Sequence, residues 1–173
     1  LRRVLVFFGG VDSANLTGRA IKALMAPELA HLAVDVVLGL QCPHCEAVET
    51  LVAKRPHTTL HGPQPSLAGL IARADLAIGA GGATTWERVC LGLPSVVLPI
   101  AANQLPFSEA LAAAGLIYLL PDLADLAGKL AAIAPHLLGQ SKKCHRLTDG
   151  WGVQRLATTL LGVESPLKLR KVC

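Results

Sequence analysis

The sequence predicts a doubly wound α/β fold, in which six mostly parallel strands alternate with helices. Two observations favour this fold class. Six short apolar segments alternate with helical stretches, and most of them are continuously apolar, as strands covered by helices on both faces are. In addition, 52% of the 173 residues are hydrophobic but only 3% are aromatic, so leucine, alanine and valine must fill the core.

The predicted elements follow one another in a regular order. The strands are expected at 4–8, 34–39, 58–62, 74–80, 94–100 and 116–120. The helices are expected at 14–26, 45–54, 66–73, 84–92, 104–114 and 122–134. Asn15 opens the first helix, Gly115 marks the end of the fifth, and Asp122 is the expected N-cap of the sixth.

The helical pattern weakens beyond about residue 135, and one last helix is expected at about 151–161. We therefore expect a sheet domain over residues 1–147, followed by a C-terminal helix and tail over 148–173. Because Arg2 and Arg3 run directly into the first strand, and because the chain ends as SPLKLRKVC, we expect it to be cut from a longer protein.

Charge and composition exclude several kinds of partner. The net charge of +4 comes from scattered residues without interleaved aromatics, so no nucleic acid is expected, whereas a small anionic ligand suits this surface. No segment has the ~18 unbroken apolar residues of a membrane span. No signal peptide is recognised and the five cysteines are irregularly spaced, so we expect a reducing cytoplasm.

Glycine follows four of the first five predicted strands, so backbone can approach a ligand there. After the fourth strand, Gly81-Gly82-Ala83 leads into a helix that begins at about Thr84. Unpaired N–H groups at a helix start favour a phosphate, and the hydroxyls of Thr84 and Thr85 can add donors.

Glu87 follows in the first turn of that helix, where its carboxylate suits two neighbouring hydroxyls better than a phosphate. This pattern indicates a ribose next to a diphosphate. The alternative is that Glu87 only interacts with the helix dipole and that the glycines only allow tight packing of the helix on the sheet. The segment is neither the dinucleotide G-x-G-x-x-G motif nor a P-loop.

The exit of the first strand, GGVDSANLT, is a second loop of the same kind. Gly10 and Asp12 precede a helix start, either as part of a ligand site or as an ordinary N-cap turn. Both glycine loops point the same way in the predicted sheet, which favours one shared ligand.

Taken together, FFGGVDSANLT, ADLAIGAGGATTWERVCLGLPSVVLPIAANQ and LTDGWGVQRL resemble a known family over roughly residues 3–161. The chain resembles the carboxy-terminal half of the UDP-sugar hydrolases of pseudaminic acid synthesis (PseG) and of the related spore-coat polysaccharide proteins (SpsG). Both are similar to the nucleotide-binding half of GT-B glycosyltransferases such as MurG. The resemblance implies a Rossmann-like half of a GT-B fold that binds a UDP-sugar.

The resemblance also implies a role for particular residues. It assigns the diphosphate to Gly82, Ala83, Thr84 and Thr85, and the ribose to Glu87. The Asn103–Gln104 pair faces the sugar, and Gly10 and Asp12 face the diphosphate and the cleft between the two halves. The family reaction is attack of water on the anomeric carbon without a metal or cofactor, and the proposed general-base histidine lies in the amino-terminal half.

Three functions therefore stay open. The chain is interpreted as the UDP-sugar-binding half of a PseG-like hydrolase in nonulosonic acid or surface polysaccharide synthesis. The alternatives are the corresponding half of a GT-B glycosyltransferase, and a stand-alone nucleotide-binding partner subunit. In the first two cases the partner is the protein's own amino-terminal domain.

Two further features are interpreted structurally. The sequence QCPHC at 41–45 departs from the family pattern and is interpreted as a surface turn, with a metal or redox site as the alternatives. Trp86 is interpreted as packing at the edge of its helix, with stacking near the ligand as the alternative.

Overall fold

The computed structural model describes residues 1–162 and contains one six-stranded parallel sheet in the order β3-β2-β1-β4-β5-β6. The strands are β1 Arg3–Phe7, β2 Ala33–Val37, β3 Thr58–His61, β4 Leu76–Ala80, β5 Ser95–Leu98 and β6 Tyr118–Leu119. The α-helices are α1 Leu16–Ala23, α2 Cys45–Lys54, α3 Ala68–Arg73, α4 Thr84–Cys90, α5 Leu105–Ala113, α6 Leu126–Ile133, α7 Leu137–Leu147 and α8 Gly152–Leu161. Three 3₁₀ turns lie at Pro27–Leu29, Ala102–Gln104 and Ala134–His136. The predicted doubly wound fold is confirmed.

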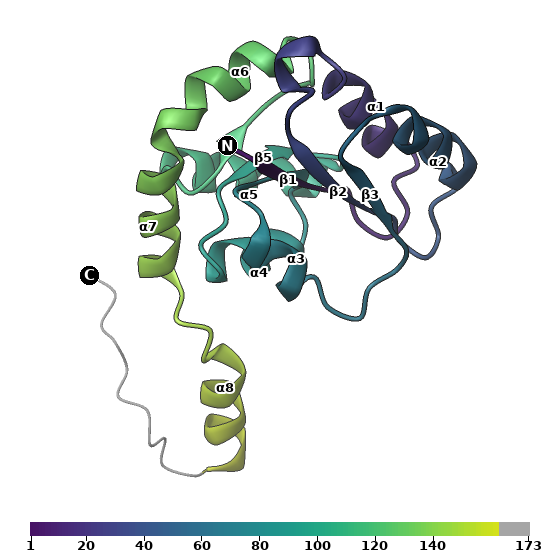
Figure 1. Cartoon of the computed structure of the whole chain (residues 1–173). Helices are drawn as coiled ribbons and strands as arrows, with labels where there is room; N and C mark the ends of the chain where they lie inside the picture. The colour runs from purple at the N-terminus through teal and green to yellow at the C-terminus, as the bar shows by residue number, and fades with distance from the viewer. Residues whose placement is uncertain (163–173) are drawn as a thin grey trace.

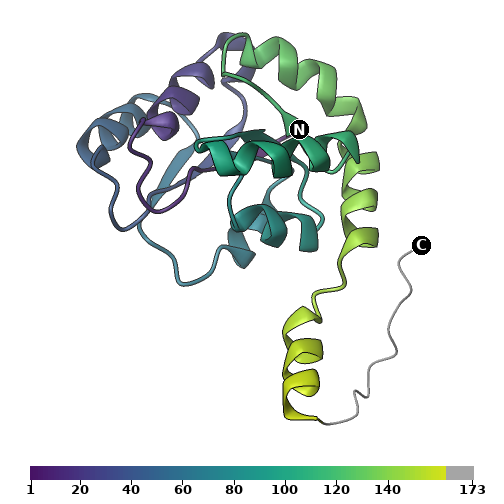
Figure 2. The same cartoon turned by 180° about the vertical axis from the view of Figure 1, so that it is seen from behind.

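Helices cover both faces of the sheet (Figures 1 and 2). Alternate residues of β1 point to opposite faces, so Val4 and Val6 pack in a cluster with α1, α2 and α6, whereas Leu5 packs on the opposite face with α3. A third cluster joins β5 to α4, α5 and α7 on the second face. Burial on both faces explains the continuously apolar strands.

Two details differ from the predictions near the C-terminal end. The helix α7 was not predicted, because the seam that it buries contains Gln140 and Cys144 in place of an apolar repeat. The N-cap of α6 is Asp125 and not Asp122, since the Asp125 side chain accepts from the N–H of Gly128. By contrast, the N-cap role of Asn15 at α1 is confirmed by its bond from Gly18.

The helix α8 stands apart from the layered part of the molecule in both views (Figures 1 and 2). The division into 1–147 and 148–173 stays a prediction, and the tail from residue 163 lies outside the described residues. Among the described helices, none combines the length and the apolar character needed to cross a bilayer.

Asp35 lies in the middle of β2, fully buried, and ties β1, β3 and α3 together. Its carboxylate accepts from Arg3 Nη1 at 3.0 Å and from the His61 ring at 2.8 Å, and it is paired with Arg73. Burial alone would raise the pKa of Asp35, but hydrogen bonds from the three basic side chains outweigh it and hold the pKa below its ordinary value.

Replacing Asp35 with asparagine is expected to lower the free energy of unfolding by roughly 2 kcal/mol at neutral pH. The cost falls short of the ~3–5 kcal/mol of a fully buried pair, because Arg3 and Arg73 are 37% and 47% exposed and still reach water. Since the pKa of Asp35 is lower in the folded chain than in the unfolded chain, its carboxylate contributes fully to the free energy of unfolding above about pH 4. This contribution is lost as the pH falls through the folded-state pKa.

Urea unfolding at neutral pH and in steps below about pH 4 measures both effects. The matched control is Lys129→Met, which removes an exposed ion pair with Asp122 and should cost less than about 1 kcal/mol. If the difference in the free energy of unfolding between the wild type and Asp35→Asn does not become smaller in acid, this role of the carboxylate is contradicted.

Candidate functional site

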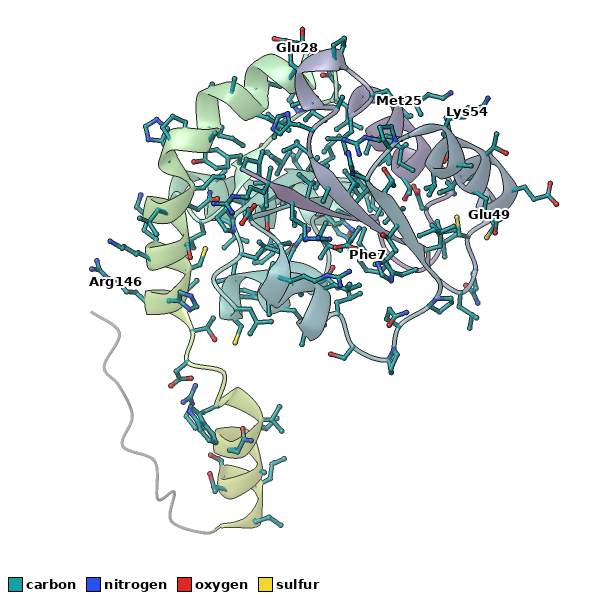
Figure 3. All side chains as sticks on the ribbon, viewed as in Figure 1. Phe7, Met25, Glu28, Glu49, Lys54 and Arg146 are labelled. Atoms are coloured by element: carbon teal, nitrogen blue, oxygen red, sulfur yellow. The ribbon has the colours of Figure 1, made fainter. Side chains whose placement is uncertain are left out.

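The strand order reverses between β1 and β4, and the two glycine loops flank this point. In open α/β sheets, ligands bind outside the carboxyl ends of the strands where the order reverses. The chain leaves β1 at Phe7, labelled in Figure 3, and enters Gly9-Gly10; it leaves β4 at Ala80 and enters Gly81-Gly82. The structure therefore brings together the two loops that the sequence singled out.

Arg88 fixes the turn between β4 and α4 from below. Its side chain is buried, and Nη2 donates to the carbonyl of Ala80 and to Thr85 Oγ1, both at 2.8 Å. The Thr85 hydroxyl itself donates to the Ala80 carbonyl at 3.3 Å. The end of β4 and the start of α4 are thus held by one buried network.

This network changes the interpretation of Thr85. Its side chain is fully buried, its hydroxyl is engaged with Arg88 and Ala80, and its backbone N–H donates to Gly82. The residue therefore supports the turn from inside and does not present its hydroxyl to a ligand. The N–H groups of Ala83 and Thr84, in contrast, donate to no carbonyl within the described chain and remain available.

Arg88 has no acidic partner within residues 1–162, and its Nε lacks a hydrogen-bond acceptor there. Burial lowers the pKa of Arg88 to about 10, so the guanidinium is still protonated at neutral pH. A cation therefore lies beneath the Gly81–Thr84 turn, where it favours negative charge. Arg88 was not predicted as a site residue, and the only feature of the sequence that indicates its role is its three-residue spacing from Thr85.

The glycines of the strand exits fall into two groups. A Cβ on Gly79 would lie 2.2 Å from the carbonyl oxygen of Phe7, and one on Gly39 would lie 2.3 Å from backbone atoms of Gly10. These two glycines allow neighbouring backbone segments to pack. A Cβ on Gly10 would meet nothing within 4 Å, and one on Gly82 only the Gln104 side chain at 3.9 Å. Of these four glycines, Gly10 and Gly82 leave backbone open to a ligand, as do Gly9 and Gly62, around which a Cβ would also meet nothing within 4 Å.

A first hollow of about 370 Å³ lies on one side of α4, at the carboxyl ends of β1, β2 and β3. Thr84 and Glu87 line it from the helix, and Gly10 lines it from the first glycine loop. Its remaining wall is largely apolar and comes from the end of β1 and the exits of β2 and β3: Phe7, Val37, Leu38, Gly39, Leu40, Pro63, Gln64, Pro65, Ser66 and Leu67. Residues 64–67 were not expected at the site, although Pro63 and Pro65 indicate a loop between β3 and α3.

A second hollow of about 300 Å³ lies on the other side of α4. It is lined by Gly81, Gly82, Ala83, Trp86, Asn103, Gln104 and Phe107. The Oε1 atom of Gln104 accepts from the N–H of Ile100 at 3.0 Å, which fixes the amide and leaves its NH₂ group as a donor. Seven of the nine predicted site residues thus line one of the two hollows, which share the Gly82–Thr84 turn as their common border.

Asp12 lines neither hollow. Its buried carboxylate accepts from the N–H groups of Leu16 and Thr17, both at 2.8 Å, and its backbone is left-handed with φ 45°. Both oxygens are therefore used by the first turn of α1. Asp12 shapes the loop that carries Gly10, as the N-cap alternative predicted.

The QCPHC segment is more integrated than a surface turn. Cys42 is buried in the core cluster, Cys45 Sγ donates to the Cys42 carbonyl at 3.1 Å, and His44 Nε2 lies 2.9 Å from the carbonyl of Ser13. The interpretation as an incidental turn was wrong for Cys42, which fills the space beneath the β2 exit. Among residues 1–162, no group of three His, Cys, Asp or Glu side chains is placed to hold a metal ion.

The two groups of glycines predict effects of different size on the free energy of unfolding. Gly79→Ala is expected to lower the free energy of unfolding by about 3 kcal/mol or more, because the new methyl meets the rigid Phe7 carbonyl. The control Gly82→Ala is expected to change it by less than about 1 kcal/mol. Urea unfolding of both variants measures the difference, and equal losses would contradict the division.

No family model matches the sequence. The chain is 30% identical over 168 residues to the spore coat polysaccharide biosynthesis protein SpsG of Bacillus subtilis (strain 168). This match covers 92% of the chain but 50% of SpsG, so the chain spans half the length of this relative.

Solved structures with the same fold include MurG of Acinetobacter baumannii, with a TM-score of 0.68, 20% identity, and coverage of 93% of this chain and 50% of MurG. The spinosyn rhamnosyltransferase SpnG, solved with thymidine diphosphate, has a TM-score of 0.68 and 27% identity, over 92% of this chain and 45% of SpnG. The chain is thus homologous to part of SpsG, and its fold is that of the carboxy-terminal domains of MurG-like GT-B glycosyltransferases.

Proposed function

We propose that the chain is the UDP-sugar-binding half of a two-part enzyme of surface polysaccharide biosynthesis. The observation that carries the proposal is the meeting of the two open glycines, Gly10 and Gly82, at the point where the strand order reverses. Homology to SpsG supports the polysaccharide context. The thymidine diphosphate bound to SpnG supports a nucleoside diphosphate as the type of ligand.

The two hollows suit the two ends of such a ligand. In the first hollow, the exposed carboxylate of Glu87 would accept from the ribose hydroxyls, and the apolar exits of β2 and β3 would cover the base. The N–H groups of Ala83 and Thr84, above the buried Arg88, would bind the diphosphate. Asn103 and Gln104 in the second hollow would face the sugar.

We propose hydrolysis, in which water attacks the anomeric carbon and UDP leaves, as the reaction of the whole protein. The PseG-like sequence blocks support it. Among the described residues, no histidine lines either hollow, which supports a general base supplied by the other half. A GT-B glycosyl transfer is the second candidate, because MurG and SpnG, which share the fold, are glycosyltransferases. A stand-alone binding subunit is the third.

Calorimetric titration of this chain with UDP, with AMP as the control, tests the nucleotide part of the proposal. Saturable binding that is selective for UDP is expected. Binding of neither nucleotide, or equal binding of both, would contradict it. For the reaction, the full-length protein is incubated with UDP-N-acetylglucosamine in the absence of an acceptor, and release of UDP and free sugar distinguishes hydrolysis from transfer.

Glu87→Ala is expected to weaken UDP binding by about 1.5–3 kcal/mol, because two ribose hydroxyls lose a charged acceptor. The matched control is Glu109→Ala, which removes an exposed acid on α5 that lines neither hollow. Titration of both folded variants with UDP gives the comparison. Unchanged affinity in Glu87→Ala would exclude the ribose contact.

Thr84→Val is expected to weaken UDP binding more than uridine binding, because the lost hydroxyl borders the turn assigned to the diphosphate. The difference should be about 1.5–3 kcal/mol, the range for a hydrogen bond to a charged group. Thr50→Val on α2 is the control, since that hydroxyl bonds only to its own helix at Glu46. Equal losses for UDP and uridine would place Thr84 away from the phosphates.

A further inference from the structure

Trp86 and Phe107 form an aromatic pair at the edge of the second hollow. Their ring centroids lie 5.2 Å apart and the ring planes are tilted by 48°. Phe107 is half-buried and packs against the cluster of α4, β5 and α5, so it anchors the pair from below. Trp86 remains 47% exposed beside the Gly81–Ala83 turn. A large apolar surface is therefore held in place and left open at the candidate site.

The opposite wall of this hollow is polar. Asn103 is exposed, and Gln104 is fixed through its Oε1 atom by the N–H of Ile100, so its NH₂ group is the free end. Gly82 contributes bare backbone, with only the Gln104 amide near its missing side chain. The hollow thus combines one aromatic wall, one wall of amide donors and acceptors, and a backbone floor.

This combination matches the surface of a pyranose ring, which carries C–H groups on its faces and hydroxyls around its edge. A diphosphate would gain nothing from an aromatic wall, and its N–H donors lie on the turn between the two hollows. A nucleobase could stack on Trp86, but the acidic side chain suited to the adjoining ribose, Glu87, lines the first hollow.

We propose that Trp86, supported by Phe107, is the platform on which the hexose of the nucleotide sugar stacks, and that it determines sugar specificity. The inference rests on the proposed function and extends it to the sugar subsite. The face of the sugar ring lies on the indole, and its hydroxyls lie toward Asn103 and the Gln104 amide. Trp86 acts on binding and orientation, and it takes no part in proton transfer.

The chain supplies its own probe, because it contains two tryptophans, Trp86 and Trp151. Trp151 lies at the start of α8 and lines neither hollow. In a Trp151→Phe variant, all tryptophan emission comes from Trp86. Titration with UDP-N-acetylglucosamine is expected to change this emission, whereas titration with UDP is expected to change it little. Affinity for UDP-N-acetylglucosamine should exceed that for UDP by about threefold to tenfold.

Trp86→Ala should abolish this preference and leave the affinity for UDP within about twofold, while Trp86→Phe should restore part of the preference. Equal losses for both ligands, or an emission change as large with UDP, would assign the indole to the base or the diphosphate and overturn the proposal. Unchanged binding of both ligands by Trp86→Ala would overturn it as well. Failure of the parent chain to bind UDP would instead overturn the proposed function on which the platform rests.

Discussion

The buried guanidinium of Arg88 holds the turn on which both hollows depend. Residues Gly81–Ala83 line the second hollow and Thr84 lines the first. The turn that these four residues form is fixed by the hydrogen bonds from Arg88 to the Ala80 carbonyl and to Thr85. Burying a cation without an acidic partner is costly, and two neutral acceptors offset only part of that cost. An anion bound over the turn would offset more of it, so the same group that shapes the turn also favours a charged ligand.

The sheet and most of its helices were predictable, because burial on both faces leaves a strong and simple pattern. All six predicted strands overlap observed ones, and the helix at 45–54 has the observed bounds. The failure at α7 has a specific cause. Its buried seam runs through Gln140 and Cys144 with half-buried leucines at either end, so packing on α4 and not apolar periodicity makes this segment helical. A helix whose buried positions are not apolar cannot be recognised from the apolar periodicity of its sequence.

The location of the candidate site was predictable from the sequence. Whether each residue there faces a ligand or the rest of the fold was not. Glycine at a strand exit keeps the backbone bare, and the sequence does not say whether a ligand or a neighbouring backbone segment is the reason. At Gly79 and Gly39 it is the neighbouring backbone; at Gly10 and Gly82 the space is open. Asp12 and Thr85 show the same ambiguity for polar groups, since their oxygens bond to the fold itself. Arg88 was overlooked because it follows Glu87 and so looks like an ordinary charged residue on a helix surface.

The surface at the carboxyl ends of the strands, where the candidate site lies, is unusually apolar. Val11, Leu40, Ile100 and Leu105 are 47%, 83%, 45% and 44% exposed, and each follows the exit of β1, β2 or β5. Exposed apolar side chains gathered around a polar centre are typical of a surface that another body covers. SpsG is twice as long as the segment matched here. In the two-part enzyme proposed above, a second half would supply the body that covers this surface. The exposed apolar side chains support an interpretation in which the turn above Arg88 binds the ligand on one side and that second half encloses it from the other side.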